Sequence, residues 1–217
     1  EDIRRIRDEC QHVHSVIPLN TGSARLKYRK ADTSGQFWGV NAEFSDAFGW
    51  PVEEGRFIGS GDLKKWRKIA VIGLKIKEDL FGEKPALGRE IKINGRRYEV
   101  VGVMSEKRMF YEDWGQRVFI PFTTAAKRMI GNDYLDVLFV YAKGARDANQ
   151  AADEIRRTLR RYKEHGDEFI IETADSQIQE VNRIFGIMKI VVGGIAFVSL
   201  LVGGIGIMNI MLVSVTE

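Results

Sequence analysis

The first residues along the chain that could take part in chemistry are Cys10, His12 and His14. His12 and His14 are two positions apart, so on a strand both imidazoles would lie on one face and could bind a metal ion together with a third ligand. The sequence offers no third ligand at a suitable spacing, and two solvent-facing histidines are the favoured interpretation. Cys10 is the only cysteine, which excludes an intrachain disulfide and fits a small apolar core residue.

The sequence lacks the usual catalytic motifs. Its carboxylates mostly alternate with basic residues, as on solvated faces, so no acid–base pair for hydrolysis stands out. There is no Gly-x-Ser-x-Gly motif, and the stretch from Gly59 to Gly61 lacks the Lys-Ser/Thr ending of a phosphate-binding loop. We therefore predict that this chain is not an enzyme and that it binds no metal and no cofactor itself.

The charged residues are distributed unevenly. All 33 Lys and Arg residues and 29 of the 30 Asp and Glu residues lie within residues 1–189, a net charge of +4 for that part. Such a small net charge does not favour a polyanionic partner. A basic cluster begins at Arg156 on an expected helix, but a solvated helix face is the favoured interpretation, so we predict no nucleic-acid partner.

The last part of the chain is apolar. Ile190–Thr216 comprises 27 consecutive residues without Lys, Arg, Asp, Glu or His. As a helix it would be about 40 Å long, more than the roughly 30 Å hydrocarbon thickness of a bilayer. A buried helix of a soluble protein is usually shorter and carries a polar stripe. We predict a tilted transmembrane helix over 190–216, surrounded by membrane lipid.

Small and polar residues gather on one side of this helix. At about 100° per residue, four small residues fall within an arc of roughly 80°, and an asparagine flanks it. Small residues let helices approach closely in lipid, where an amide also seeks a partner. Alternatively, small residues are simply common in membrane helices. The predicted helix-contact residues are Ala196, Ser199, Gly203, Gly206 and Asn209.

Residues 1–189 show short helical and strand patterns in alternation, which indicates a compact α+β domain. The clearest pattern is Asn94-Gly95 between two apolar stretches, which predicts a hairpin with a type I′ turn. Further strands are expected at 13–19, 24–30, 36–41, 68–74, 117–122, 134–143 and 168–173, and helices at 1–9, 75–82, 123–131 and 148–165.

A last helix is expected from about Ser176, with Ile178, Val181, Ile184 and Met188 facing inward. Neither a proline nor a charge interrupts the pattern after Lys189, so we predict that this helix continues into the membrane. The domain and the membrane helix would then be joined by one lever, about 60 Å long at 1.5 Å per residue.

The closing sequence "LLVGGIGIMNIMLVSVTE" closely resembles the second transmembrane helix of the macrolide-exporter (MacB-like) permeases, the branch of ABC transporters that also contains FtsX and LolC/LolE relatives. A looser similarity extends upstream. The stretches "GRFIGSGD", "KIAVIG", "LGREIKINGRRYEVVGVM" and "DWGQRVFIPFTTA" occur in the order and near the spacing of that family's large extracytoplasmic domain. The first fifty residues match only weakly.

The resemblance implies a two-part extracytoplasmic domain followed by one transmembrane helix. Residues 1–66 and 123–176 would form a porter-like subdomain, and 67–122 a smaller inserted α/β subdomain. A juxtamembrane helix at 177–189 and the membrane helix at 190–216 would follow. Residues 1–189 would then lie on the periplasmic side of the cytoplasmic membrane.

The resemblance also implies a function, in which the domain transmits ATPase-driven motion across the membrane to export or extract a substrate. The permease would form a homodimer or heterodimer and pair with a cytoplasmic ABC ATPase, which binds the ATP. The resemblance leaves open the substrate, a periplasmic adaptor and an outer-membrane channel. The alternative is a single-span membrane-anchored sensor or ligand-binding module. The small-residue face and the family motif favour the permease.

Overall fold

The computed structural model describes residues 2–109, 112–131, 135–162 and 169–216. These residues group into two compact units, 1–145 and 146–217. Helices and strands alternate along the first unit, which confirms the α+β class predicted from the sequence. Its helices are α1 (Asp2–Glu9), α2 (Phe44–Ala47), α3 (Ser60–Lys64), α4 (Leu74–Phe81), the short turn η1 (Trp114–Gln116), α5 (Phe122–Ala125) and the π-helix η2 (Ala126–Ile130). Its strands are β1 (Val13–Tyr28), β2 (Ala31–Val40), β3 (Val52–Gly55), β4 (Ile69–Ile72), β5 (Glu90–Ile93), β6 (Arg96–Met104), β7 (Arg108–Met109), β8 (Glu112–Asp113), β9 (Arg117–Pro121) and β10 (Val137–Ala142).

The main sheet contains a closed ring of strand pairs. β1 pairs with β2, β2 with β9, β9 with β4, β4 with β6, β6 with β5, and β5 returns to β1. Two further strands extend the sheet, because β10 pairs with the first half of β1 and β3 pairs with the end of β6. The long strand β1 is therefore shared between the ring and the β10 extension.

The central strands β4 and β9 are buried on both faces, which explains their uninterrupted apolar sequences. On β4, Ala70 and Ile72 belong to one core, while Ile69 and Val71 belong to the other. The first core lies against α4 and is mainly aliphatic. The second is rich in aromatic rings, with Trp50 and Phe119 at its centre and their ring centroids 5.2 Å apart. The sheet thus separates two cores of different composition.

Several local predictions are confirmed. Asn94 and Gly95 both have positive φ, as a type I′ turn requires, and they join β5 to β6. α4 ends at Gly82, whose φ is also positive. The expected strands at 13–19 and 24–30 are instead one strand, β1, and 31–35 belongs to β2. The residues "NTGS" between the two expected strands stay extended because β2 pairs with them along their whole length.

The sheet does not divide at either limit of the expected insert, 67–122. Inside those limits lie β4, β5, β6 and β9, and these strands share one hydrogen-bonded sheet with β1, β2 and β10. Leu26 and Phe37 also share a core with Ile72, Tyr98 and other residues of 67–122. Strands within 67–122 therefore pair with strands outside it. The division into a porter-like part and an inserted part stays a prediction.

The second unit contains α6 (Ala148–Tyr162) and α7 (Ala174–Thr216). The turn η3 (Ala145–Asp147) directly precedes α6. Ala152 and Ile155 of α6 are buried, whereas Tyr162 is exposed. Within 169–173 the chain is irregular, so the strand expected at 168–173 is not formed there. Ile170 is 87% exposed, and an extended segment needs a paired neighbour to become a strand.

Candidate functional site

The long helix α7 begins with a reciprocal cap. The Ser176 backbone N–H donates to Thr173 Oγ1 at 3.2 Å, and the Thr173 backbone N–H donates to Ser176 Oγ at 3.0 Å. The Ser176 hydroxyl in turn donates to the Thr173 carbonyl oxygen at 2.8 Å. These bonds satisfy backbone N–H groups that would have no partner at a helix start. The position of the helix start, predicted near Ser176, is thus fixed by two hydroxyl side chains.

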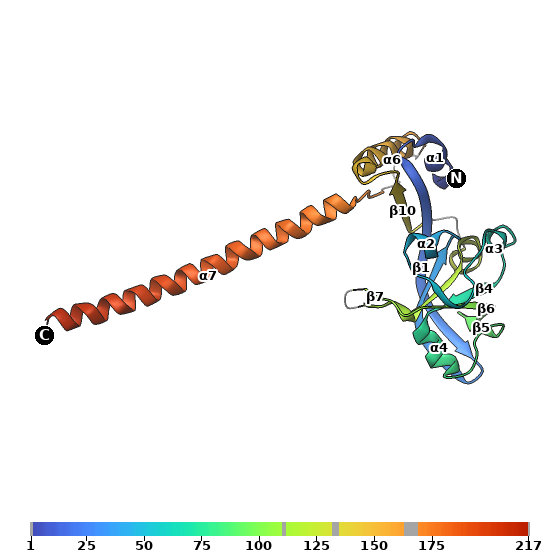
Figure 1. Ribbon diagram of the computed structural model, residues 1–217, viewed down its shortest axis with the longest axis horizontal. Helices are drawn as coiled ribbons and strands as arrows, with labels where there is room; N and C mark the ends of the chain where they lie inside the picture. Colours follow the sequence, from blue (N-terminus) through green and yellow to red (C-terminus); the bar gives the residue numbers. More distant parts are fainter. Residues whose placement is uncertain (1, 110–111, 132–134, 163–168, 217) are drawn as a thin grey trace. The chain divides into compact units, whose positions relative to one another are not determined.

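α7 is one unbroken helix of 43 residues (Figure 1). At 1.5 Å per residue it is about 65 Å long, and the prediction that the last helix continues unbroken past Lys189 is confirmed. Its stretch Ala174–Leu212 is long and apolar enough to cross a membrane, and an 18-residue window within it has a mean hydropathy of 2.5 and no buried residue. The polar first turns and the apolar remainder therefore form one continuous rod.

The predicted contact face of α7 is uncovered. A side chain built at Gly203 or Gly206 would meet no atom within 4 Å, and Ala196 is exposed. The Ser199 hydroxyl donates to the Ile195 carbonyl oxygen, 2.9 Å away within the same helix. The side chain of Asn209 lies outside the described part of the structure. Contact of this face with another helix stays a prediction.

The expected inward face at the start of α7 is not covered either. Ile178, Val181, Ile184 and Met188 are all at least half exposed. The prediction that they face inward is wrong within this chain, because no described element buries them. An apolar stripe on the water-side turns of the helix thus has no partner in the structure.

The histidines form no metal site with their described neighbours. His12 lies in a turn before β1 and is half-buried, and His14 is an exposed residue of β1. Among the residues that the structure describes, no three His, Cys, Asp or Glu side chains cluster as metal ligands. Cys10 is buried and is not part of a disulfide. His165 lies outside the described residues.

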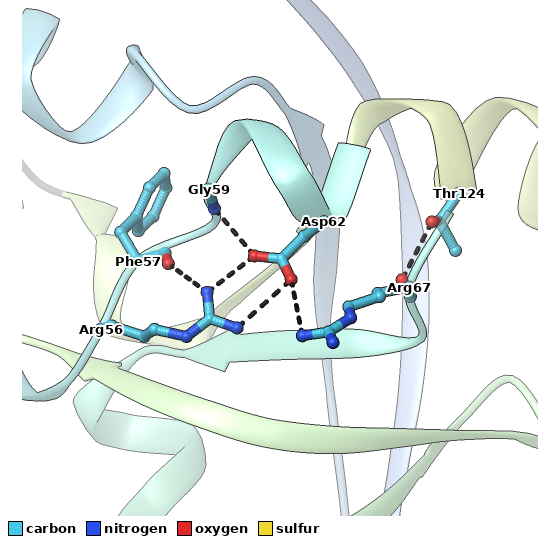
Figure 2. A network of polar contacts seen from close by, with 6 residues as sticks. All are labelled: Arg56, Phe57, Gly59, Asp62, Arg67 and Thr124. Atoms are coloured by element: carbon cyan, nitrogen blue, oxygen red, sulfur yellow. Dashed lines mark hydrogen bonds and ion pairs between the residues drawn. The ribbon is translucent and has the colours of Figure 1, made fainter. Parts of the chain in front are cut away.

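A polar network centred on Asp62 joins α3 to the segments that precede and follow it (Figure 2). The Asp62 carboxylate is almost fully buried and accepts two bonds from Arg56, Nη1 to Oδ2 at 2.7 Å and Nη2 to Oδ1 at 3.2 Å. Arg67 Nη1 lies 3.4 Å from Asp62 Oδ1, and the Gly59 backbone N–H donates to Oδ2 at 2.9 Å. The Asp62 carboxylate therefore connects Arg56, which precedes α3, with Arg67, which follows it.

The ionisation of Asp62 is stabilised by this network. Burial alone would raise the pKa of the carboxyl, but the hydrogen bonds from Arg56 and Gly59 and the charges of Arg56 and Arg67 outweigh it, so the pKa is lowered. The pKa of Arg56 is raised, chiefly by its hydrogen bond to Asp62. The carboxylate is thus charged at neutral pH and acts as a structural clamp.

The network is attached to the rest of the unit by two threonines. Thr124 Oγ1 donates to the Arg67 carbonyl oxygen at 3.0 Å, and Thr123 Oγ1 donates to the Leu63 carbonyl oxygen at 2.8 Å. The sequence predicted a helix that begins at Thr123 or Thr124. In the structure α5 begins at Phe122, after Pro121, and neither threonine hydroxyl caps it. Both hydroxyls donate instead to carbonyl oxygens of Leu63 and Arg67. The signal for the network was the carboxylate of Asp62 three residues after Gly59, a helix-capping spacing.

Comparison with known proteins gives one consistent family. Residues 1–158 match the family described as "MacB-like periplasmic core domain". The chain is 33% identical over 212 residues, 96% of its length, to a pyoverdine export ATP-binding/permease protein PvdT of Pseudomonas savastanoi. It is 34% identical over 221 residues, covering the whole chain, to a macrolide export ATP-binding/permease protein MacB of Wolinella succinogenes. The chain spans about a third of the length of these relatives, 32% and 34%.

Solved structures agree on the fold. The periplasmic region of MacB from Actinobacillus actinomycetemcomitans superposes with a TM-score of 0.73 at 21% identity, covering 83% of this chain and 81% of that one. The extracellular domain of the ABC-type transporter YknZ from Gram-positive bacteria gives a TM-score of 0.67 at 23% identity, covering 77% of this chain and 83% of that one.

Proposed function

This chain belongs to the MacB-like periplasmic core domain family of ABC transporter permeases, and from that premise we propose that it transmits ATPase-driven motion across the membrane to export or extract a substrate. The family is one of transporters rather than enzymes. The relatives differ in the molecule that their names give as exported, pyoverdine in one and macrolide in the other. We therefore propose transport without assigning the transported molecule.

The observation that carries the proposal is the continuity of α7. A single helix runs from the capped start at Thr173 to Thr216, so its water-side turns and its membrane-side turns cannot move independently without breaking backbone hydrogen bonds. A rod of this kind passes a tilt or a shift from one end to the other. A flexible linker of the same length would absorb the motion.

The proposed location follows from the family and from α7. The core domain lies in the periplasm, and α7 crosses the cytoplasmic membrane. Each of these relatives is named as a single ATP-binding/permease protein. We propose that this chain likewise works with a cytoplasmic ABC ATPase, as part of a permease dimer. A periplasmic adaptor and an outer-membrane channel are further proposed partners.

The small-residue face of α7 supports the dimer and multi-helix arrangement. Ala196, Ser199, Gly203, Gly206 and Asn209 would let neighbouring membrane helices approach the α7 backbone closely. Because Ser199 already donates its proton within α7, its oxygen is left as an acceptor toward a neighbour. A single-span anchor would not require such a face.

The experiment compares two substitutions at one exposed position of the water-side turns. Arg183→Pro removes a helix hydrogen bond and kinks α7, whereas Arg183→Ala keeps the helix and removes the same charge. The complete transporter with its ATPase is reconstituted, and substrate-stimulated ATP hydrolysis and export are measured. We expect Arg183→Pro to uncouple hydrolysis from export and Arg183→Ala to retain coupling. Equal coupling in both variants, with both correctly inserted, would rule out transmission through a rigid α7.

A further inference from the structure

The turn after α3 presents a concentrated basic surface. All five residues of the Trp66 turn, Lys64–Lys68, are exposed, and four of them are cationic. Arg67 is held by Asp62. Within the part of the chain that the structure describes, Lys64, Lys65 and Lys68 have no acidic partner at ion-pair distance. Since residues 1–189 have a net charge of only +4, this turn is a local excess of positive charge.

Trp66 has a backbone conformation that is unfavourable for a bulky residue. Its φ is +50°, in the left-handed region, where glycine is usual after a helix. The Arg67 N–H donates to the Asp62 carbonyl oxygen at 3.0 Å and the Trp66 N–H donates to the Leu63 carbonyl oxygen at 3.3 Å, which is the bonding of a Schellman motif. The indole is nevertheless 44% exposed. Strain of this kind is typical of functional positions, and core packing does not explain the ring.

A further cation covers one face of the Trp66 ring. Lys127 Nζ lies 3.7 Å from the ring centroid, a cation–π contact. Lys127 is exposed and belongs to the π-helix η2, an irregularity that is frequent at functional sites. The hydrogen bonds from Thr123 and Thr124 to the α3 loop hold the two segments together. The ring and the cations therefore form one preorganised surface, the Trp66 turn together with Lys127.

We propose that this surface binds the anionic headgroups of a phospholipid bilayer. Lysine and arginine clusters bind anionic lipid phosphates, and tryptophan rings lie at the level of the headgroups. A bilayer is also the polyanionic surface to which this domain is tethered under the proposed function, because the same chain carries the apolar stretch that begins at Ile190. The inference uses the membrane helix of the proposed function but does not depend on transport.

Tryptophan fluorescence can report the contact selectively. All four tryptophans, Trp38, Trp50, Trp66 and Trp114, lie in the first unit, and α7 has none. The full chain is reconstituted into vesicles in which either phosphatidylglycerol or phosphatidylcholine carries bromine on its acyl chains near the glycerol. The difference between the wild type and Trp66→Gly isolates the Trp66 signal. We expect brominated phosphatidylglycerol to quench this signal at low salt, and high salt to reverse the quenching.

The variants separate lipid binding from folding. Lys64→Gln/Lys65→Gln/Lys68→Gln should abolish the quenching, because each lysine near an anionic surface strengthens association by about fivefold. The control Lys30→Gln/Lys84→Gln/Lys92→Gln removes the same charge from exposed sites elsewhere and should quench like the wild type. Trp66→Gly should raise the melting temperature, because glycine fits the left-handed backbone.

Three results would overturn the proposal. The first is equal quenching by brominated phosphatidylcholine and phosphatidylglycerol, or no quenching by either. The second is a lower melting temperature for Trp66→Gly, which would make the ring structural. The third is a change of Trp66 emission on adding poly-glutamate in the absence of lipid quenching, which would assign the surface to an acidic protein partner. None of these measurements requires export, so they are independent of the test at Arg183.

Discussion

The first unit and the helix α7 differ in how far their large apolar side chains are exposed. In residues 1–145 most of the large apolar residues are packed on the two faces of one sheet, and Phe119 is completely buried. In α7 the apolar residues are exposed along almost the whole helix, and Phe197 is 65% exposed. The first unit contains its own cores, whereas the large apolar side chains of α7 belong to neither of these cores. The difference teaches that the residues that stabilise the domain and those of the proposed transmitting helix lie in separate segments.

The largest expected effect tests that contrast with the same change in each unit. Phe119→Ala should lower the free energy of unfolding by about 3–5 kcal/mol, because it leaves a cavity among aromatic rings. Phe197→Ala should leave unfolding of the domain unchanged, because the ring contacts no core. Chemical denaturation followed by tryptophan fluorescence measures both. A comparable loss from Phe197→Ala would mean that α7 is part of the folded core.

The second prediction concerns the charged clamp inside the first unit. Asp62→Asn should cost about 2 kcal/mol at pH 7, because hydrogen bonds to a charged group are lost. The folded-state pKa of Asp62 is lowered, so its contribution to stability is present above the unfolded-state pKa of about 4 and is lost as the pH falls through the folded-state value.

Unfolding curves at pH 7 and at progressively lower pH test this sign. The gap in stability between the wild type and Asp62→Asn should narrow on acidification. The control is Asp32→Asn, which removes a carboxylate paired with Arg25 at an exposed site and should change stability very little. A gap that widens at low pH would contradict the clamp.

The third prediction concerns the uncovered face of α7. Gly203→Leu should lower ATP-dependent export by roughly tenfold, because contacts between membrane helices are worth about 1–2 kcal/mol and a bulky side chain blocks close approach. Val202→Leu is the control, since its side chain points about 100° away and adds one methylene. Export and substrate-stimulated ATPase activity are measured in the full complex. Equal activity of the two variants, both normally inserted, would mean that the small face is not a helix contact.

The elements that sequence reasoning predicted correctly are those determined by neighbours along the chain. The Asn94-Gly95 turn requires positive φ at two successive residues, and few other pairs meet that requirement. The unbroken apolar pattern after Lys189 likewise sufficed to predict a continuous helix over α7. In both cases the determining residues are within a few positions of one another.

The elements that were missed depend on partners far away in sequence. The stretch around Thr21 has turn-like residues, yet it stays in β1 because β2 pairs with it. The ring of strands crosses both limits of the expected insert through the pairings of β2 with β9 and of β1 with β5. The exposed Trp66 was missed because local rules expect glycine at a left-handed position.

The pairing of β1 with β10 determines how the first unit responds to force. The chain enters β1 at Val13 and leaves β10 at Ala142, and these two residues are paired in antiparallel strands. The hydrogen bonds of an antiparallel ladder are perpendicular to its strands. A pull that separates the two connections therefore loads these bonds one at a time, starting at the pair Val13 and Ala142. A push that displaces both connections together loads none of them. The β1–β10 ladder is therefore loaded by a displacement of one connection against the other and not by a displacement of both connections together.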